Sequence, residues 1–481
     1  MSFPQTSRVP SDVASGFSKR FGPWILFALA LMFLALTFRP VVEGDGVGYY
    51  SYLHAIFVSH SLDFKSEYSA AIASHVPLYR PLVTTRTVTG NLANFFPVGP
   101  ALLSAPAYLV ALVLRPSGEP QYSSPFIEAF TIASLLYGLV ALAICYRIAL
   151  RLVLNRRAAI VGVLGAMFST PLVYYMLSDP SYSHTFSVFC VSAFLYVWWT
   201  GPPNSRLGWF GLGLLGGLMG LTRFQDGALV AIVLVDVKRF RWSSLAFLPG
   251  LLVGFAPQLA IDQVQFATWL PQRPPGQGLD PLHGHYLQVL FSSLDGLFIW
   301  TPAALLAAAG FWFVKDRRLQ LAAVFAFVLE TLLIGSAPDT VGAAFGSRRY
   351  LDLIPFAVVG MAGIAERPGP RFDWAAIGAL CAWNVTLVAS FEYVFGRRDP
   401  GYAGLIIGQV RALPYLPHLL AKGAVIREAG SLGTTRFELI RAGGLLALEA
   451  LALAAAIWTA VGVRRVPGRA PKLGETHATI R

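Results

Sequence analysis

Residues 97–114, PVGPALLSAPAYLVALVL, decide how this chain is arranged in a membrane. The segment is apolar and long enough to cross a bilayer, because a spanning helix needs about 17–25 residues. It begins with PVGP and carries Pro106 in its middle, and prolines interrupt or bend helices. Such a segment can instead lie in the interface or return to the face from which it entered. The charges of the neighbouring loops distinguish the two arrangements.

The whole chain has the composition of a membrane protein. Of its 481 residues, 55% are hydrophobic and 13% are charged, and its mean hydropathy is +0.59. A soluble domain is about a quarter charged, so this chain has too little charge for a soluble surface. The net charge of +12 comes mostly from short clusters between apolar runs, a pattern that reports membrane orientation rather than nucleic-acid binding. Three cysteines lie within apolar runs, without metal-ligand or disulfide spacing: Cys145, Cys190 and Cys381.

Thirteen apolar segments are candidates for membrane crossing. They are residues 23–42, 97–114, 126–148, 158–177, 183–200, 207–222, 224–237, 243–261, 294–314, 319–336, 351–365, 373–394 and 442–463. The sixth and seventh are short helices that meet at a polar turn. Lys19 and Arg20 precede the first segment, and no small-residue cleavage site follows it. We therefore expect an uncleaved anchor with the N-terminus in the cytosol.

Charge indicates which of these segments cross. If all thirteen crossed, the basic clusters within 147–157, 238–241 and 315–318 would lie outside, against the positive-inside rule. If 97–114 does not cross, these three clusters become cytosolic, and two later basic clusters do as well. The sequence therefore predicts an all-α polytopic membrane protein with both termini inside. We expect about 12 transmembrane helices and a re-entrant or interfacial helix near 97–114.

This map also organises the rest of the chain. Residues 1–22 are expected to form a cytosolic N-terminus, 23–465 a single transmembrane domain, and 466–481 a disordered cytosolic tail. Long connections are usually functional or disordered. Three long connections are assigned to the outer face, with interfacial helices expected in the first: 43–125, 262–293 and 395–441. Three shorter ones join them there: the turn at Asp179, the turn from Arg223 to Asp226, and 337–350.

The first outer loop opens with EGDGVGYY, residues 43–50. Three glycines flank the carboxylate of Asp45, so the backbone can bend at the end of a helix and leave room for a bulky ligand beside the acid. Glu43, Tyr49 and Tyr50 lie close to it in sequence. The alternative is a flexible exit loop with an aromatic belt.

Another outer segment, SDPSYSH at residues 178–184, holds Asp179 and His184 between two apolar helices. The two side chains are either substrate contacts or parts of a solvated Asp-Pro turn. On this map Asp179 and Asp45 emerge on the same membrane face, although their segments are far apart in sequence. This shared location favours a joint site.

Two more outer segments carry candidate ligands. Arg348 and Arg349 lie in FGSRRY, residues 345–350, and arginine suits bidentate phosphate contacts. Lipid headgroups or a carboxylate such as Asp339 are their alternative partners. His283 and His285 form a His-x-His pair that can bind metal, but no third strong ligand lies nearby. Substrate contact or a plain loop is favoured for this pair.

Several of these segments resemble those of one family. The features are GDG around Asp45 with its two following tyrosines, FFPVGP at residues 95–100, Asp179 in its turn, and GSRR at 346–349. They resemble the GT-C superfamily of membrane glycosyltransferases. Within it the chain is similar to the branch containing protein O-mannosyltransferases, aminoarabinose transferases and rhizobial core-sugar transferases, most clearly over the first 200 residues. Many members carry an adjacent Asp-Glu pair in the first loop, whereas Gly44 separates Glu43 and Asp45 here.

The resemblance implies a GT-C-like fold and a polyprenyl-phosphate sugar donor used at the outer, periplasmic face of the bacterial cytoplasmic membrane. The acceptor hydroxyl would belong to a glycan, a lipid or a protein. The resemblance also maps the family's two loop acids to Asp45 and Asp179. It implies no cofactor, because this branch generally uses no metal.

The chemistry of these residues agrees with that implication. A carboxylate can deprotonate the acceptor by general-base catalysis, and arginines can meet the charge that develops on the leaving phosphate. Direct displacement would invert the anomeric carbon. We predict Asp45 as the base, Arg348 and Arg349 as a phosphate clamp, and Asp179 and His184 as acceptor or sugar contacts. The remaining predicted substrate-binding residues are Glu43, Tyr49, Tyr50, His283 and His285.

The alternative function is that of a membrane transporter or lipid flippase. Such proteins place ionisable groups near the membrane midplane, facing a pathway. Apart from charged residues within three positions of a segment end, only Glu330 and Glu449 lie inside apolar segments, and both map to the outer half. Because the polar residues collect at one face, the sequence favours surface chemistry over translocation.

Overall fold

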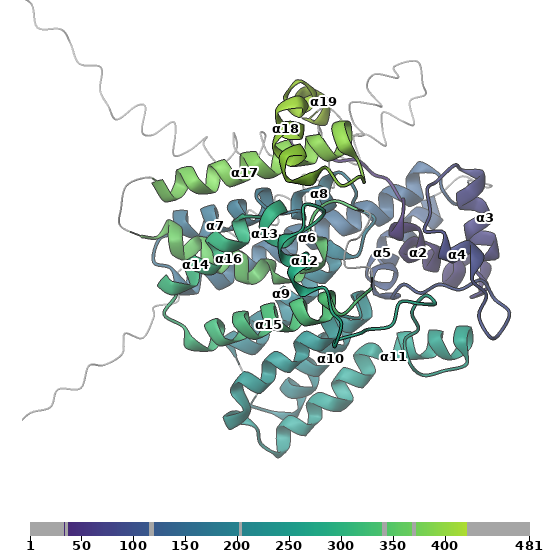
Figure 1. Ribbon diagram of the computed structural model, residues 1–481. Coiled ribbons are helices and arrows are strands. Elements are labelled where there is room, and N and C mark those ends of the chain that lie inside the picture. Colours follow the sequence, from purple (N-terminus) through teal and green to yellow (C-terminus); the bar gives the residue numbers. More distant parts are fainter. Residues whose placement is uncertain are drawn as a thin grey trace, which may run out of the picture.

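The computed structural model describes residues 33, 37–114, 120–201, 204–338, 344–367 and 372–420. Within these ranges the regular elements are helices (Figure 1). Two isolated β-bridges, Gly44–Leu78 and Arg86–Leu92, are the β-structure of the described residues. The predicted all-α fold is confirmed. Most of the predicted segment 23–42, all of 442–463 with Glu449, Asp339 and both predicted terminal regions lie outside the described residues.

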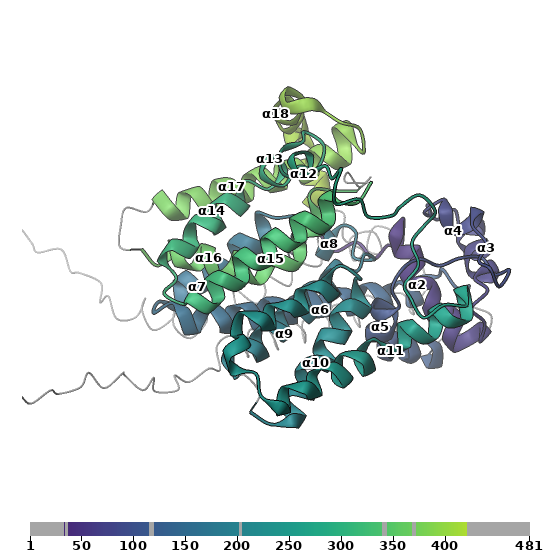
Figure 2. The same ribbon diagram turned by 60° about the horizontal axis from the view of Figure 1, so that its bottom comes forward.

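The first predicted outer loop contains the expected short helices. They are α2 (Asp45–His54), a π-helical turn (Ala55–Ser59), α3 (Lys65–Ala73) and α4 (Pro81–Thr84). Figures 1 and 2 show α2, α3 and α4 together at one end of the molecule, in purple. This loop is therefore a folded unit packed on the bundle rather than a flexible exit loop.

Helix α5 (Gly99–Leu114) covers the segment whose proline pattern was unusual. It has 16 residues and keeps Pro106 inside the helix. A helix of this length spans about 24 Å at 1.5 Å per residue. The hydrocarbon core of a bilayer is about 30 Å thick. The helices at His184–Thr200 and Arg206–Thr222 have 17 residues each and cover predicted spans, so length does not decide whether α5 crosses. Its depth in the membrane stays a prediction.

The other helices form the bundle. In chain order they are α6 (Ser124–Leu152), α7 (Arg156–Phe168), α8 (Leu172–Leu177), α9 (His184–Thr200), α10 (Arg206–Thr222), η2 (Asp226–Arg239), η3 (Trp242–Ala246), α11 (Phe247–Phe266), α12 (Tyr286–Phe291), α13 (Leu297–Trp300), α14 (Ala303–Gly310), η4 (Phe311–Phe313), α15 (Arg317–Gly335), η5 (Arg348–Leu353), α16 (Ile354–Ala365), α17 (Phe372–Ser390), η6 (Phe391–Phe395), α18 (Gly401–Ala412), η7 (Leu413–Tyr415) and α19 (Leu416–Leu420).

The described part of the chain contains four helical stretches that are long and apolar enough to cross a membrane. They are Ser124–Leu152, Trp242–Phe266, Arg317–Gly335 and Trp374–Phe395. Helices α10 and α11 lie side by side in both views (Figures 1 and 2). A Cβ on Gly213 or Gly217 would meet the backbone of α11, and one on Gly250 or Gly254 would meet that of α10. Small residues at these positions let the two helix backbones approach closely. The total of about 12 spans stays a prediction.

A break between α7 and α8 positions part of the candidate site. The sequence suggested one helix over 158–177, but Pro171 begins a new helix there. Two side chains before it turn back on the first helix: Ser169 donates to the Gly165 carbonyl at 2.6 Å, and Thr170 to the Ala166 carbonyl at 2.7 Å. They add hydrogen bonds to carbonyls in the last turn of α7, where the helix ends.

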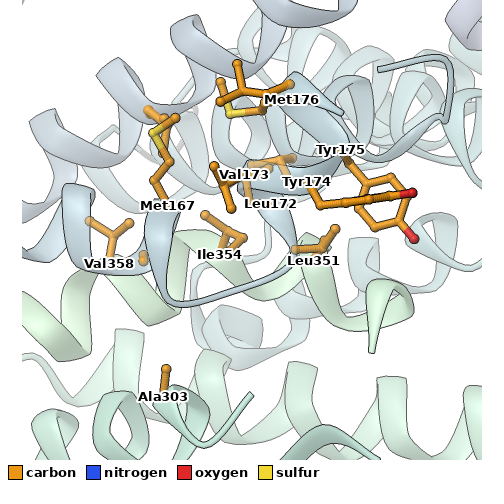
Figure 3. Packing of buried hydrophobic residues seen from close by; sticks show 14 of the residues in the cluster. Met167, Leu172, Val173, Tyr174, Tyr175, Met176, Ala303, Leu351, Ile354 and Val358 are labelled. Carbon is orange, nitrogen blue, oxygen red and sulfur yellow. The ribbon is translucent and has the colours of Figure 1, made fainter. Parts of the chain in front are cut away.

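The core packs around this break. Met167, Leu172 and Val173 lie against Ile354 and Val358 at the start of α16 (Figure 3). The Tyr175 hydroxyl donates to the Phe345 carbonyl at 2.9 Å. This packing holds the predicted Asp179 turn and the predicted arginine turn beside each other.

The basic clusters assigned to the cytosol occur together at the far helix ends. The Asn155 N–H donates to Glu366 at 3.1 Å, Arg367 lies over the Phe313 ring at 4.5 Å, and Arg318 forms an ion pair with Asp236. The polar turns assigned to the outer face lie at the opposite ends of these helices. The grouping of loops by charge therefore agrees with the structure.

Candidate functional site

A cavity of about 660 Å³ receives residues from all six connections assigned to the outer face. It contains the carboxylate of Asp45, and no other Asp or Glu lines it among the described residues. Six arginines line it: Arg80, Arg223, Arg273, Arg348, Arg349 and Arg397. Such a wall has a strong positive field and suits an anionic ligand.

Asp45 is the first residue of α2, where the sequence indicated a sharp bend. The bend is at Gly44, whose φ of +60° favours glycine. The N-terminal end of a helix stabilises a carboxylate. The side chain is 24% exposed, and its Oδ2 accepts a hydrogen bond from Arg348 at 3.0 Å. A solvent-accessible carboxylate is thus held beside a guanidinium.

The glycines around Asp45 have a different role from the expected one. A Cβ on Gly44 would lie 2.7 Å from the Tyr182 hydroxyl, one on Gly46 would collide with Ser181, and one on Gly48 would collide with Phe96. The expectation that they leave room for a ligand is therefore wrong. Protein fills the space, because these glycines let two other segments pack directly against α2.

Arg348 is held in the cavity by an acid and an aromatic ring. Its guanidinium is 14% exposed and lies over the Tyr182 ring, with Cζ 5.2 Å from the ring centroid. Burial alone would lower the pKa of Arg348, but Asp45, Tyr175 and Tyr182 offset this effect and raise the pKa above its ordinary value. The side chain stays charged, and its fork keeps N–H groups for another acceptor.

Two predicted contacts, Tyr49 and His184, also line the cavity. Tyr49 accepts a hydrogen bond from Ser183 at 3.0 Å, and burial together with Asp45 raises the pKa of Tyr49 to about 12. His184 is 3% exposed, and its ring stacks on Tyr182 with an interplanar angle of 8°. Its Nδ1 is buried without a hydrogen-bond partner in the described chain. Buried polar atoms are normally paired, so this unpaired nitrogen next to the cavity is unusual.

Arg223 and Gln225 line the cavity as well, although the sequence marked them only as a polar turn. Arg223 is 8% exposed, with one guanidinium nitrogen 3.5 Å from Asp226 and 3.7 Å from Asp352. The Gln225 amide donates to Glu330 at 2.7 Å and to the Arg349 carbonyl at 2.9 Å. The turn thus connects a buried acidic cluster to the arginine pair.

The structure does not bring Asp179 or Glu43 into the cavity lining. Asp179 is 4% exposed and accepts a hydrogen bond from Ser181 at 2.9 Å. Burial raises the pKa of Asp179, and the neighbouring Glu43 raises it further. Ser181 also receives the Glu43 backbone N–H at 3.4 Å. In this structure the acid supports the turn beneath α2.

Tyr50 also lies outside the cavity lining, as do His283 and His285 in the connection 262–293. Tyr50 is fully buried, and its hydroxyl donates to the Gln121 carbonyl at 2.5 Å. His283 is exposed and pairs with Asp280 at 3.0 Å, while the His285 backbone N–H donates to the Gly335 carbonyl at 2.7 Å. Within the described ranges, no group of three or more His, Cys, Asp or Glu side chains could hold a metal ion.

Sequence reasoning missed several residues of the lining. Tyr182 stood inside the quoted segment 178–184, but nothing marked its ring as a partner for Arg348. Arg80 and Arg273 were isolated charges in loops assigned to the outer face, and Arg397 stands beside Arg398 and Asp399. Arg80 and Arg273 could have been recognised as site candidates from the sequence, because the positive-inside rule makes arginines on the outer face unusual.

Comparison with known proteins gives one solved structure. No family model matches the chain, and no curated protein matches it. The crystal structure of ArnT from Cupriavidus metallidurans bound to undecaprenyl phosphate is similar, with 18% sequence identity and a TM-score of 0.48. The match covers 92% of this chain and 77% of that one. Neither a sugar nor an acceptor for this chain follows from it.

Proposed function

We propose that this chain is a membrane glycosyltransferase of the GT-C type. It moves a sugar from a polyprenyl-phosphate-linked donor to a hydroxyl acceptor at the outer face of the bacterial cytoplasmic membrane. The observation that carries the proposal is the contact between Asp45 and Arg348, 3.0 Å apart in an arginine-lined cavity. It pairs a group able to act as a base with a group able to bind phosphate.

The proposed reaction is one displacement. Asp45 takes the proton of the acceptor hydroxyl, whose oxygen bonds to the anomeric carbon. The bond between that carbon and the phosphate oxygen breaks, and its electron pair leaves with the polyprenyl phosphate. Arg348 and Arg349 meet the charge that develops on the phosphate. Attack from the opposite side inverts the anomeric configuration.

The salt bridge is compatible with both roles. Arg348 engages Oδ2 of Asp45, and no hydrogen bond to Oδ1 is found within the described part of the chain. The free oxygen can receive the acceptor hydroxyl. The guanidinium lies beside the carboxylate and offsets the repulsion that a bound phosphate would otherwise exert on it.

A second cavity, also of about 660 Å³, supports a lipid-linked donor. Ser347 and Tyr350, on either side of the arginine pair, line its edge. Most of its wall is apolar, formed by α14, α15 and α16 with residues such as Leu305, Phe327 and Ile354. An apolar cavity that adjoins a pair of arginines suits a ligand with a phosphate head and a hydrocarbon tail.

The structure offers little support for the transport alternative. Glu330, the intramembrane acid that could have marked a pathway, is 0% exposed. It is hydrogen-bonded to Gln225 and lies beneath the cavity. Within the described chain this acid belongs to the packing of the site rather than to an open path.

Reconstituted protein tests the proposal. Proteoliposomes would be supplied with polyprenyl-phosphate sugars and extracted acceptor glycolipids or glycans. The expected products are a glycosylated acceptor of inverted anomeric configuration and free polyprenyl phosphate. Movement of the intact donor between leaflets, without cleavage of its sugar–phosphate bond, would instead indicate a flippase and contradict the proposal.

A further inference from the structure

Glu330 and Asp352 are buried acids beneath the cavity, and the proposed reaction does not use them. Glu330 lies on α15 and Asp352 on η5, and both are 0% exposed. Acids buried inside a membrane bundle are costly, so they usually serve a functional site. The residue that joins these two acids to the cavity is Gln225, which is half-buried and belongs to the cavity lining.

The contacts of the Gln225 side chain fix the orientation of its amide. Its Nε2 lies 2.7 Å from Glu330 Oε2, 2.9 Å from the Arg349 carbonyl oxygen and 3.3 Å from Asp352 Oδ2. A backbone carbonyl only accepts hydrogen bonds, so the amide atom beside it must be the donating nitrogen. A flipped amide would face the Arg349 carbonyl with a second acceptor. The amide nitrogen is therefore held on the side of the buried acids.

The amide oxygen of Gln225 is left open to the cavity. No hydrogen bond to Oε1 occurs within the part of the chain that the structure describes. Oε1 of Glu330 and Oδ1 of Asp352 are buried without a partner, whereas Gln225 Oε1 is not buried. Since Gln225 is part of the lining, this accessible oxygen can accept a hydrogen bond from a ligand in the cavity.

The position of this oxygen suits the sugar of a donor. Oε1 is bonded to the same carbon as Nε2, which touches the backbone of Arg349, so it lies beside the predicted phosphate clamp. The sugar of a sugar phosphate is attached directly to the phosphate, and its hydroxyls need acceptors. The six arginines of the lining only donate, and the carboxylate of Asp45 is engaged by Arg348. Gln225 supplies a neutral acceptor for a sugar hydroxyl.

We propose that Gln225 contacts the donor sugar and selects it, with Oε1 accepting a hydrogen bond from a sugar hydroxyl beside the phosphate. Glu330 and Asp352 are positioning residues, because they hold Nε2 and so keep Oε1 turned toward the cavity. The inference rests on the proposed function, since it presumes that Arg348 and Arg349 bind the donor phosphate. Such a site disfavours a sugar without that hydroxyl, because Oε1 would then lack a partner.

Matched probes separate the sugar from the phosphate. Farnesyl methyl phosphate carries a methyl group in place of the sugar. Farnesyl-phosphoryl glucose, galactose, mannose and arabinose are diesters of the same charge. Binding of each probe to the purified full chain is titrated in detergent. The sugar preference is the Kd of the methyl diester divided by the Kd of the tightest glycosyl probe. For the wild type we expect a preference of at least about fivefold, the effect of one neutral hydrogen bond.

Gln225→Leu removes both polar atoms of the amide and should lower the sugar preference about fivefold. Gln288→Leu is the matched control, because Gln288 is exposed on α12 and lies outside the cavity lining. It should keep the wild-type preference. A residue that only supports the arginine turn would weaken the methyl diester and the glycosyl probes equally. An unchanged preference in Gln225→Leu, or a wild type without any preference, would overturn the proposal.

Monodeoxy versions of the tightest glycosyl probe give a second measurement that needs only the wild type, so it holds even where Gln225→Leu does not fold. Removal of one particular hydroxyl should weaken binding to the wild type about fivefold. Where Gln225→Leu folds, it should bind this monodeoxy probe as well as the parent probe. If every monodeoxy probe binds the wild type like its parent, the sugar contact is overturned.

Arg348→Gln distinguishes failure of this inference from failure of the proposed function. It should weaken the methyl diester and the glycosyl probes alike. If it does so while the wild type shows no sugar preference, the phosphate clamp stands and the sugar contact of Gln225 is wrong. If Arg348→Gln binds the methyl diester like the wild type, the clamp itself is wrong and the inference about Gln225 falls with it.

Discussion

Replacement of Arg348 by lysine keeps the positive charge and removes the guanidinium fork. The variant loses the 3.0 Å hydrogen bond to Asp45 and the stacking on Tyr182. A charge-assisted hydrogen bond contributes about 1.5–3 kcal/mol, and a cation–π contact about 0.5–1 kcal/mol. If both act in the transition state, the loss of roughly 2–4 kcal/mol lowers kcat/KM roughly 30- to 900-fold.

The assay is transfer from a radiolabelled polyprenyl-phosphate sugar in proteoliposomes. Arg411→Lys, at an exposed position on α18 outside the cavity lining, is the matched control and should keep wild-type activity. The melting temperature of each variant is measured alongside, so that a loss of stability from the altered ion pair is separated from a loss of transfer. Activity of Arg348→Lys within twofold of the wild type would refute the reasoning, because the fork would then have no part in transfer.

Three further predictions follow from packing, burial and topology. Gly46→Ala should destabilise the fold by about 1–3 kcal/mol through overpacking, whereas Gly211→Ala, with open space around it, should not. The measurement is the melting temperature of each variant in detergent, and equal melting temperatures would contradict the close packing of α2. Burial raises the pKa of Asp179 above its unfolded value, so the wild type loses stability as pH rises above about 4. Asp179→Asn should therefore melt at a higher temperature than the wild type at pH 7, and the two melting temperatures should converge toward pH 4. A difference in melting temperature that is the same at both pH values would contradict this prediction. A cysteine at Arg80 should react with an impermeant maleimide in intact cells and one at Arg156 should not, and the reverse pattern would overturn the topology.

The charge pattern bears on which connections lie together, while their orientation in the membrane stays a prediction. Positive clusters between apolar runs sorted six connections onto one face, and side chains from all six line one cavity. This worked because orientation in a membrane depends on the charge of local segments. Asp45 and Arg348 belong to two of these six connections and form a hydrogen bond, although 303 positions separate them in the sequence.

Burial could not be predicted from the same pattern. Asp179 and Asp45 looked alike as isolated acids near helix ends, yet one is 4% exposed and the other meets the cavity. Ser181 contributes to this difference, because it packs against Gly46 of α2 and donates a hydrogen bond to Asp179. Such contacts depend on tertiary packing, which no local pattern encodes.

The role of Asp45 as the base is the central claim, and Asp45→Asn tests it most directly. Purified wild type, Asp45→Asn and the exposed control Asp280→Asn would be compared for sugar transfer and for farnesyl phosphate binding. We predict that kcat of Asp45→Asn falls about 10²–10⁴-fold, the usual contribution of a general base. Phosphate affinity should stay within a few-fold, since the substitution keeps the shape of the side chain and leaves Arg348 and Arg349 in the cavity lining. Transfer by Asp45→Asn at the wild-type rate would contradict the account.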